Sequence, residues 1–145
     1  GEVPDEYYEV EIGKASVTRI GTDITLVSYG YGMRVVSDAA DTLAERGVSA
    51  EVIDLRSLSP LDLDTVVTSV QKTNRVVVVD TARRTGGIMA EVSAELQQRA
   101  GEWLDGPVIR VGSSDVPWPY SRDLEREALA DADDVLDAVS EGYGL

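Results

Sequence analysis

Hydrophobic and polar positions switch along the chain between strand-like and helix-like patterns. Apolar runs typical of buried strands occur at residues 24–29 (ITLVSY), 49–55 (SAEVIDL), 75–80 (RVVVVD) and 107–112 (PVIRVG). A shorter run at 15–20 (ASVTRI) precedes them. The run at 75–80 is apolar at four successive positions, as in a strand whose sheet is covered by helices on both faces. The pattern therefore predicts a buried sheet.

Apolar residues spaced three or four apart follow these runs and predict four helices. The stripes are Val35, Val36, Ala39, Ala40, Leu43 and Ala44; Leu63, Val66, Val67 and Val70; Ile88, Met89, Val92 and Leu96; and Val135, Leu136, Ala138 and Val139. Pro60 is expected near the start of the second helix, where its missing N–H costs least. Strands alternating with helices predict βαβ units and an open, mostly parallel sheet. Residues 112–130 lack a clear period, and we expect them to wrap the surface before the last helix.

The length of 145 residues favours one domain with a substantial core. We expect that domain at 14–145, after an acidic linker or tail at 1–13. The first residue is Gly rather than Met, which we interpret as a sign of a processed or truncated chain. No signal peptide is visible in the acidic start, so the expected location is cytoplasmic.

The charge balance and the missing residue types exclude several classes of function. There are 27 acidic and 13 basic residues, a formal net charge of −14, which argues against nucleic acid and anionic membranes as partners. A basic protein partner is compatible with this charge, and so is plain solubility. The chain has no His and no Cys, which excludes Ser-His-Asp and Cys-His catalysis and His- or Cys-based zinc sites. A carboxylate-only metal site stays open.

The stretch DTARRTGG (80–87) is the strongest local candidate for binding. Thr85 can cap the helix that follows, and Gly86 and Gly87 allow close approach of a backbone. Arg83 and Arg84 add positive charge beside free helix N–H groups, a combination that suits a phosphate or a carboxylate. The alternative is a packed turn that only positions the helix.

Two further motifs are weaker. GYGMRV (30–35) imitates a dinucleotide fingerprint, but Val35 stands where the third glycine is needed, so a glycine turn is the favoured interpretation. ADADDVLD (130–137) resembles a calcium loop but lacks its spacing and its distal Glu. Carboxylates at a helix start instead predict capping.

A rigid aromatic strap is predicted at DVPWPYS (115–121). Pro117 and Pro119 fix the chain on either side of Trp118, and Tyr120 follows. Such straps are common at subunit contacts. The alternative is a lid over the domain's own core.

In order, the stretches YEVEIGKASVTRIGTDITLVSYG, AEVIDLRSLSPLDLDTVVTSVQKT, RVVVVDTARRTGGIMAEVSAELQ and DVPWPYSRDLEREAL cover nearly the whole chain. Together they resemble the C-terminal domain of the β subunit of thiamine-diphosphate-dependent 2-oxo acid dehydrogenases, the E1 component. The Pro-Tyr-Ser version of the last motif is more similar to pyruvate or acetoin enzymes than to branched-chain ones. The resemblance implies a three-layer α/β/α fold with a mainly parallel five-stranded sheet. One strand is antiparallel, expected at ASVTRI or its neighbour.

The resemblance also implies which parts of the enzyme lie elsewhere. In this family thiamine diphosphate and Mg²⁺ are held between the α subunit and the N-terminal domain of the β subunit. We therefore expect no cofactor and no catalytic residue in this chain, which would be inactive alone, whether it is a fragment or a stand-alone homologue. Its implied role is assembly of an α₂β₂ heterotetramer, with Arg84, Thr85, Gly86 and Gly87 facing an interface.

The family also presents an acidic surface to the basic subunit-binding domain of the E2 acyltransferase. Candidates here, chosen by charge and position, are Asp115, Asp133, Asp134, Glu141 and the Leu145 carboxylate. Two other functions stay open. One is the equivalent domain of another transketolase-like enzyme, such as a deoxyxylulose phosphate synthase. The other is a stand-alone anion-binding regulatory domain that uses Arg83, Arg84 and the glycines that follow.

Overall fold

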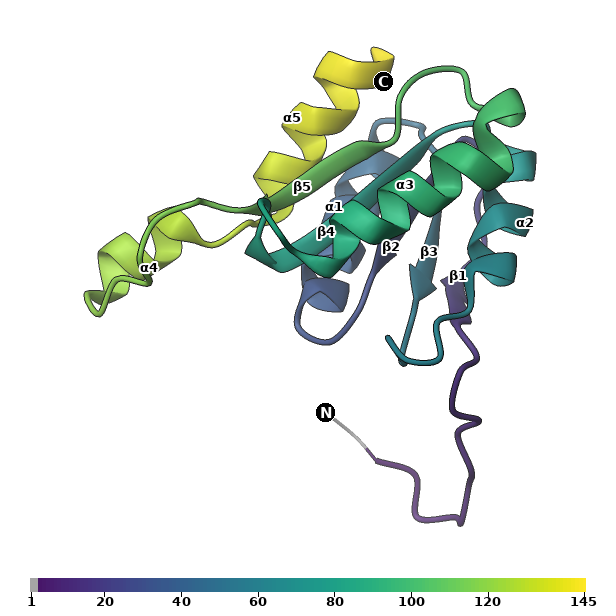
Figure 1. Ribbon diagram of the computed structural model, residues 1–145, viewed down its shortest axis with the longest axis horizontal. Helices are drawn as coiled ribbons and strands as arrows, with labels where there is room; N and C mark the ends of the chain where they lie inside the picture. The colour runs from purple at the N-terminus through teal and green to yellow at the C-terminus, as the bar shows by residue number, and fades with distance from the viewer. Residues whose placement is uncertain (1–2) are drawn as a thin grey trace.

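A five-stranded sheet forms the centre of the computed structural model, which describes residues 3–145 (Figure 1). Its strand order is β1-β3-β2-β4-β5. The strands are β1 (Ser16–Arg19), β2 (Ile24–Ser28), β3 (Ala50–Asp54), β4 (Val76–Arg83) and β5 (Ile109–Ser113). β1 pairs antiparallel with β3, and all other neighbours are parallel. This confirms the mainly parallel sheet and places the antiparallel strand at ASVTRI.

Helices cover both faces of the sheet and complete three layers. α1 (Gly32–Glu45) and α5 (Ala132–Tyr143) pack on one face, and α2 (Leu63–Thr73) and α3 (Ile88–Ala100) on the other. Each pair shares a buried apolar cluster with the strands beneath it. Two shorter elements are the 3₁₀ turn η1 (Gly101–Trp103) and α4 (Arg122–Ala128). The predicted three-layer α/β/α architecture is therefore confirmed.

The helix boundaries follow from local chemistry. Asp62 caps α2 by accepting from the Thr65 amide at 3.2 Å, and Asp131 caps α5 by accepting from the amides of Asp133 and Asp134. The prediction of capping at DADD is thus confirmed. Pro60 lies near the start of α2, as predicted, but in the turn before it, which is closed by a Leu58–Leu61 bridge. One detail of the predicted helices is wrong, because Ala44 is exposed.

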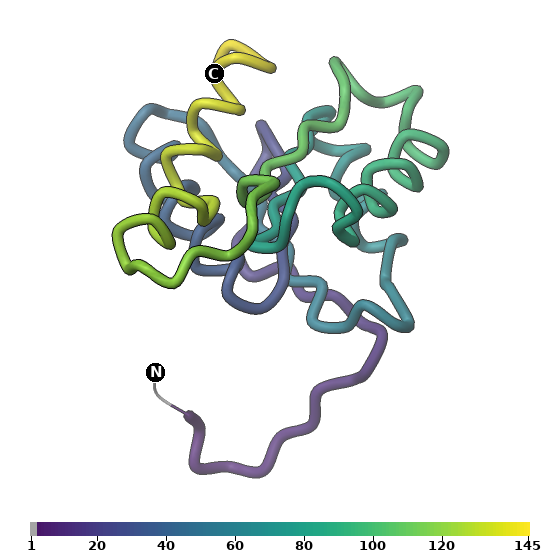
Figure 2. The backbone as a smooth tube through the Cα atoms, turned by 60° about the vertical axis from the view of Figure 1, so that its left-hand side comes forward, coloured from purple at the N-terminus to yellow at the C-terminus, as the bar shows by residue number. Residues whose placement is uncertain are grey.

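The prediction for residues 112–130 is wrong. The segment contains α4, a helix that the sequence pattern did not reveal, and it extends away from the sheet instead of wrapping the surface (Figures 1 and 2). A seven-residue helix with only Ala128 buried shows no apolar stripe for periodicity to detect. We call residues 114–129, the strap and α4 together, the arm.

Residues 3–12 are extended, have no secondary structure and are exposed throughout. Residues 1 and 2 of the predicted linker lie outside the described residues. The chain is anchored where the sheet begins: the Ala15 amide donates to Asp62 Oδ2 at 3.0 Å. The boundary at 13/14 stays a prediction. None of the described helices is both long enough and apolar enough to cross a membrane.

Candidate functional site

The carboxyl ends of β2 and β4 mark the place where sheets of this type bind ligands. β2 and β4 are neighbours, yet α1 follows β2 onto one face and α3 follows β4 onto the other. Such a reversal is a topological switch point, and ligands of open α/β sheets bind in the crevice outside it. Two of the predicted motifs, GYGMRV and DTARRTGG, lie there.

Two side chains at this crevice, Tyr29 and Asp80, are hydrogen-bonded to each other. The hydroxyl of Tyr29 donates to both carboxylate oxygens of Asp80, at 3.0 and 3.1 Å, and the Ala82 amide donates to Asp80 Oδ1 at 2.9 Å. Burial, the hydrogen bond to Asp80 and the charge of that carboxylate raise the pKa of Tyr29 to about 12, so the hydroxyl keeps its proton. Gly32 packs so closely that a Cβ there would lie 2.2 Å from Ser28 Oγ. The geometry therefore favours the glycine-turn interpretation of GYGMRV over a nucleotide site.

The Arg83–Gly87 loop leaves the sheet through an irregular step. Pairing between β4 and β5 shifts register between Asp80 and Arg83, and Gly112 of β5 lies under this step. A Cβ on Gly112 would be 3.1 Å from Arg84 Cα. A side chain at this position would force the two backbones a few tenths of an ångström apart, which glycine avoids.

Thr85 binds a carboxylate within the same chain. Its amide donates to Asp115 Oδ1 at 3.2 Å, and its hydroxyl donates to Asp115 Oδ2 at 2.5 Å. The Thr85 hydroxyl and amide, with the charges of Arg83 and Arg84, lower the pKa of Asp115. Thr85 thus binds the carboxylate of Asp115, and capture of an external anion by this loop stays a prediction.

The predicted cap at Thr85 is wrong. Gly87 is the N-cap residue of α3 and makes no side-chain cap bond. Gly86 adopts φ +74°, a backbone conformation that favours glycine. At the next position a Cβ on Gly87 would lie 2.7 Å from the Arg83 carbonyl oxygen, so this position also requires glycine. Both glycines therefore serve the turn, and Thr85 points to the arm instead of the helix.

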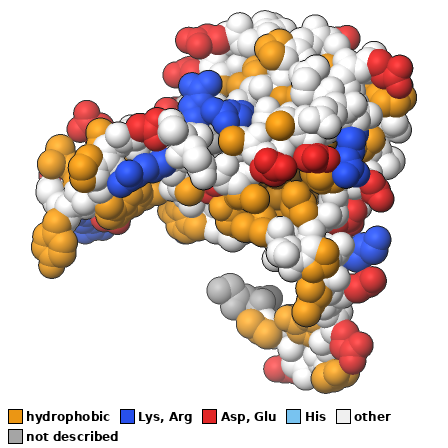
Figure 3. Space-filling model, in the orientation of Figure 1, with side chains coloured by type: hydrophobic (Ala, Val, Ile, Leu, Met, Phe, Trp, Pro, Cys, Tyr) orange, Lys and Arg blue, Asp and Glu red, His pale blue; other side chains and the backbone are white. Residues whose placement is uncertain are grey.

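The arm is pinned at its base and exposed along its length. The Ser114 amide donates to the Ala128 carbonyl at 2.9 Å, and Ser113 Oγ accepts from the Ala130 amide at 3.1 Å while donating to Thr81. Beyond that base, Trp118 is 49% exposed and Tyr120 is fully exposed. Apolar side chains gather on the projecting arm (Figure 3). Prolines and exposed aromatic rings fit a contact surface better than a lid over the domain's own core.

The five acidic candidates do not form one cluster. Asp115 is bound to Thr85. Asp133 and Asp134 lie in the first turn of α5, whereas Glu141 and Leu145 lie at its far end. Twelve helical residues span about 18 Å. The structure thus offers a patch at each end of α5, separate from the Arg83–Gly87 loop.

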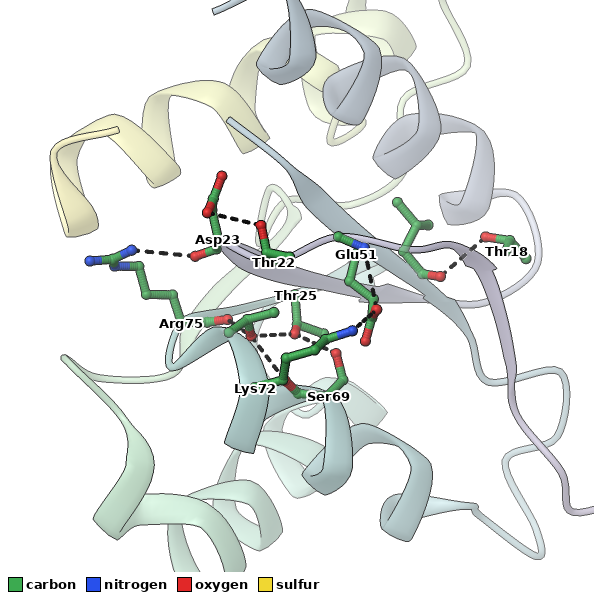
Figure 4. Close-up of polar contacts among 11 residues, drawn as sticks. Thr18, Thr22, Asp23, Thr25, Glu51, Ser69, Lys72 and Arg75 are labelled. Carbon is green, nitrogen blue, oxygen red and sulfur yellow. Dashed lines mark hydrogen bonds and ion pairs between the residues drawn. The ribbon is translucent and has the colours of Figure 1, made fainter. Parts of the chain in front are cut away.

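A polar network at the opposite end of the strands was not predicted. Glu51 of β3 is buried, accepts from Lys72 of α2 and also from the Gly21 amide at 3.3 Å (Figure 4). Thr25 Oγ1 lies 2.6 Å from Ser69 Oγ and 2.7 Å from Thr73 Oγ1. Burial opposes the ionisation of Glu51, but hydrogen bonds from Lys72, Ser69 and Gly21 outweigh it and lower its pKa. The network ties α2 to the sheet, and a charged residue inside an apolar strand pattern was its only sequence signal.

Comparisons with known proteins agree with this architecture. Residues 13–135 match the family described as "Transketolase, C-terminal domain". The chain is 46% identical over 138 residues to the pyruvate dehydrogenase E1 component subunit beta of Bacillus subtilis, covering 95% of this chain and 42% of that protein. It is 39% identical over 144 residues to the acetoin:2,6-dichlorophenolindophenol oxidoreductase subunit beta of the same organism, covering 99% and 42%.

A solved structure extends the likeness to three dimensions. It is described as a split-gene transketolase in an inactive β4 tetramer, with a TM-score of 0.82 and 30% identity, and covers 100% of this chain and 46% of that one. The chain thus spans less than half the length of the relatives it matches. With its three-layer sheet and a family match over most of its length, the chain belongs to the transketolase C-terminal domain family.

Proposed function

We propose that this chain is an assembly domain of the β subunit of a thiamine-diphosphate-dependent 2-oxo acid dehydrogenase, acting in the cytoplasm. The parent enzyme would decarboxylate pyruvate or a related 2-oxo acid. The similar proteins named as pyruvate dehydrogenase and acetoin oxidoreductase β subunits support the parent enzyme. The projecting arm, with its exposed aromatic residues, is the observation that carries the assembly role.

The arm has the composition of a protein interface. Its prolines limit the conformational entropy lost on binding, and Trp118 and Tyr120 offer large rigid surfaces. Its base is fixed beside the Arg83–Gly87 loop through the Thr85–Asp115 pair. The loop and the arm would therefore present one surface, to the α subunit and to a second β subunit in an α₂β₂ assembly.

Two observations on the described residues bear on where the cofactor of the parent enzyme binds. Residues 3–145 contain no group of three or more His, Cys, Asp or Glu side chains placed to hold a metal ion. At the switch point Tyr29 and Asp80 are hydrogen-bonded to each other, and in the Arg83–Gly87 loop Thr85 binds Asp115. We propose that thiamine diphosphate and Mg²⁺ bind to other parts of the parent enzyme and that its catalytic steps take place there.

The acidic ends of α5 fit a basic partner, for which we propose the subunit-binding domain of E2. Asp133 and Asp134 form one patch, and Glu141 with the Leu145 carboxylate forms the other. Asp115 is the weakest of the five candidates because Thr85 and two arginines already face it. Contacts between exposed charges raise the association rate and weaken with salt, because the screening length is about 8 Å at physiological ionic strength.

The assembly role is tested by binding the full chain to the α subunit of the same enzyme. Trp118→Ala should weaken this association at least about tenfold, as the loss of an aromatic interface anchor does. Trp103→Ala is the matched control, since Trp103 is 36% exposed but lies in η1, away from the arm. If Trp118→Ala binds as tightly as the control, the arm is not the interface.

A further inference from the structure

The arm is held to the rest of the domain mainly at its base. There the Arg84 amide donates to the Ser113 carbonyl at 3.3 Å, and the Ala130 amide donates to Ser113 Oγ at 3.1 Å. Among residues 3–145, no hydrogen bond or ion pair joins residues 116–127 of the arm to the rest of the domain. The direction of this outer part therefore depends on contacts close to the base.

An open hollow separates the outer part of the arm from the body of the domain. It measures about 480 Å³ and is lined on one side by Tyr31 and Thr81 of the body and on the other by arm residues that include Trp118 and Arg122. Side chains on either side of an open hollow are not held by close packing. The arm can therefore turn without displacing a packed core.

Asp115 is the outermost described residue of the arm that forms a hydrogen bond with the body. Its two carboxylate oxygens accept from the Thr85 hydroxyl and from the Thr85 amide, so the contact fixes the carboxylate in direction as well as in distance. The loop that carries Thr85 is closely packed, because a Cβ on Gly112 of β5 would lie 3.1 Å from Arg84 Cα. A contact between a fixed loop and a movable arm sets the position of the arm.

The Thr85–Asp115 contact is also open to competition. Both residues are exposed, so solutes can reach the Thr85 amide and hydroxyl. The charges of Arg83 and Arg84 act on the Asp115 carboxylate, and neither guanidinium forms an ion pair with another described residue. A phosphate group would meet the same donors, and its greater charge would use both arginines better than one carboxylate does. Because Asp115 is part of the same chain, displacing it needs a high concentration of free phosphate.

We propose that the Thr85–Asp115 contact is a latch that fixes the direction of the arm, and that a phosphate group from solution opens it by taking the place of Asp115. With the latch closed, Trp118 and Tyr120 are held in one direction and are organised in advance for a partner. With the latch open, the arm samples many directions, and a partner would have to order it on binding. The latch is a property of the arm itself and does not depend on whether the α subunit is the partner.

Two spin labels on the full chain test the latch, since the distance between them, measured by dipolar spectroscopy in a phosphate-free buffer, reports the direction of the arm. The chain has no Cys, so the labels attach only at Ser121→Cys on the arm and Ser37→Cys on α1, both exposed positions. The closed latch should give one narrow distance distribution. Asp115→Ala and Thr85→Val should each lose it, whereas Thr85→Ser, which keeps the amide and the hydroxyl, should retain it. Asp123→Ala removes a negative charge from α4 without touching the latch and is the matched control.

Inorganic phosphate should broaden the distribution of the wild type, whereas chloride at the same ionic strength should leave it narrow. Circular dichroism melting shows that each variant is folded. A broad distribution in the wild type without phosphate, a narrow one in folded Asp115→Ala, or a wild-type distribution that phosphate leaves unchanged would each overturn the proposal. Because these measurements use the chain alone, their outcome is separate from that of binding to the α subunit.

Discussion

Two carboxylates are almost equally buried in this domain, at opposite ends of the sheet, and they are stabilised differently. Glu51 is 3% exposed near the amino ends of the parallel strands, and Asp80 is 4% exposed near their carboxyl ends. Glu51 is paired with an ammonium group, Lys72, whereas Asp80 accepts from the neutral Tyr29 hydroxyl and a backbone amide. An ion pair ties a helix to the sheet at one end. At the other, a neutral donor satisfies the carboxylate beside the switch point.

Two glycines at opposite ends of the sheet, Gly21 and Gly32, should show the largest difference. A Cβ on Gly21 would lie 2.2 Å from backbone atoms of Ala50 and Glu51, which cannot move independently. A Cβ on Gly32 would lie 2.2 Å from the side-chain oxygen of Ser28. The Ser28 side chain can rotate away, but it would then lose its hydrogen bond to the Val79 carbonyl. We expect Gly21→Ala to lower the free energy of unfolding by about 3 kcal/mol or more and Gly32→Ala by less. Urea unfolding measures both, and the reverse order would contradict the packing described here.

Lys72→Met should leave Glu51 as a buried carboxylate without its cation. Removing one partner of a fully buried ion pair costs about 3–5 kcal/mol. The Lys72 side chain is 44% exposed, so water can replace part of its interaction with Glu51. We therefore expect the free energy of unfolding to fall by about 2 kcal/mol at pH 7. Lys72→Arg is the control that keeps the charge.

The stability difference between Lys72→Met and the wild type should depend on pH. The pKa of Glu51 is lowered in the folded state, so its contribution is complete above the ordinary value of 4.5 and is lost as pH falls through the folded-state pKa. In Lys72→Met, protonation removes the unpaired charge, so the stability gap to the wild type should narrow below pH 4.5. A gap of constant size from pH 7 to pH 3.5 would mean that the charge of Glu51 is not the cause.

Tyr29→Phe should have a smaller effect at the other end of the sheet. Asp80 would keep its bond from Ala82 and lose the tyrosine donor, which costs about 1–2 kcal/mol. Because the Tyr29 pKa is raised to about 12 from 10.0, its contribution is complete below pH 10 and is lost as pH rises through 12. The free energy of unfolding of the wild type, measured with denaturant, should therefore be lower at pH 11 than at pH 8. The decrease should be smaller in Tyr29→Phe, which has no hydroxyl at position 29 to ionise. An equal decrease in both proteins would show that ionisation of Tyr29 is not its cause.

The exposed Asp115 should show the smallest effect on stability. Asp115→Ala frees the Thr85 amide and hydroxyl beside Arg83 and Arg84, so the variant should gain weak stabilisation by phosphate in thermal unfolding. Arg84→Ala in the same background should abolish that gain. If phosphate stabilises the wild type as much as Asp115→Ala, Asp115 does not occupy an anion site, and a stand-alone anion-binding role would be favoured.

Much of the fold followed from local pattern. Apolar runs located five strands, helical stripes located α1, α2, α3 and α5, and a carboxylate before the last stripe marked a cap. These features are encoded within a few residues of one another, because strand and helix periods and capping bonds are short-range. The sequence pattern did not predict α4, because Ala128 is the only buried residue of that helix.

The sequence alone therefore determined the five strands, four of the helices and their order, and it predicted that the Arg-Thr-Gly-Gly loop suits a phosphate or a carboxylate. Only the tertiary structure decided which carboxylate that is, and that Tyr29 meets Asp80 across 51 positions of the chain. Such partners are set by strand order and by the register shift between β4 and β5. No local period records either of these, because they arise when distant segments pack into one sheet.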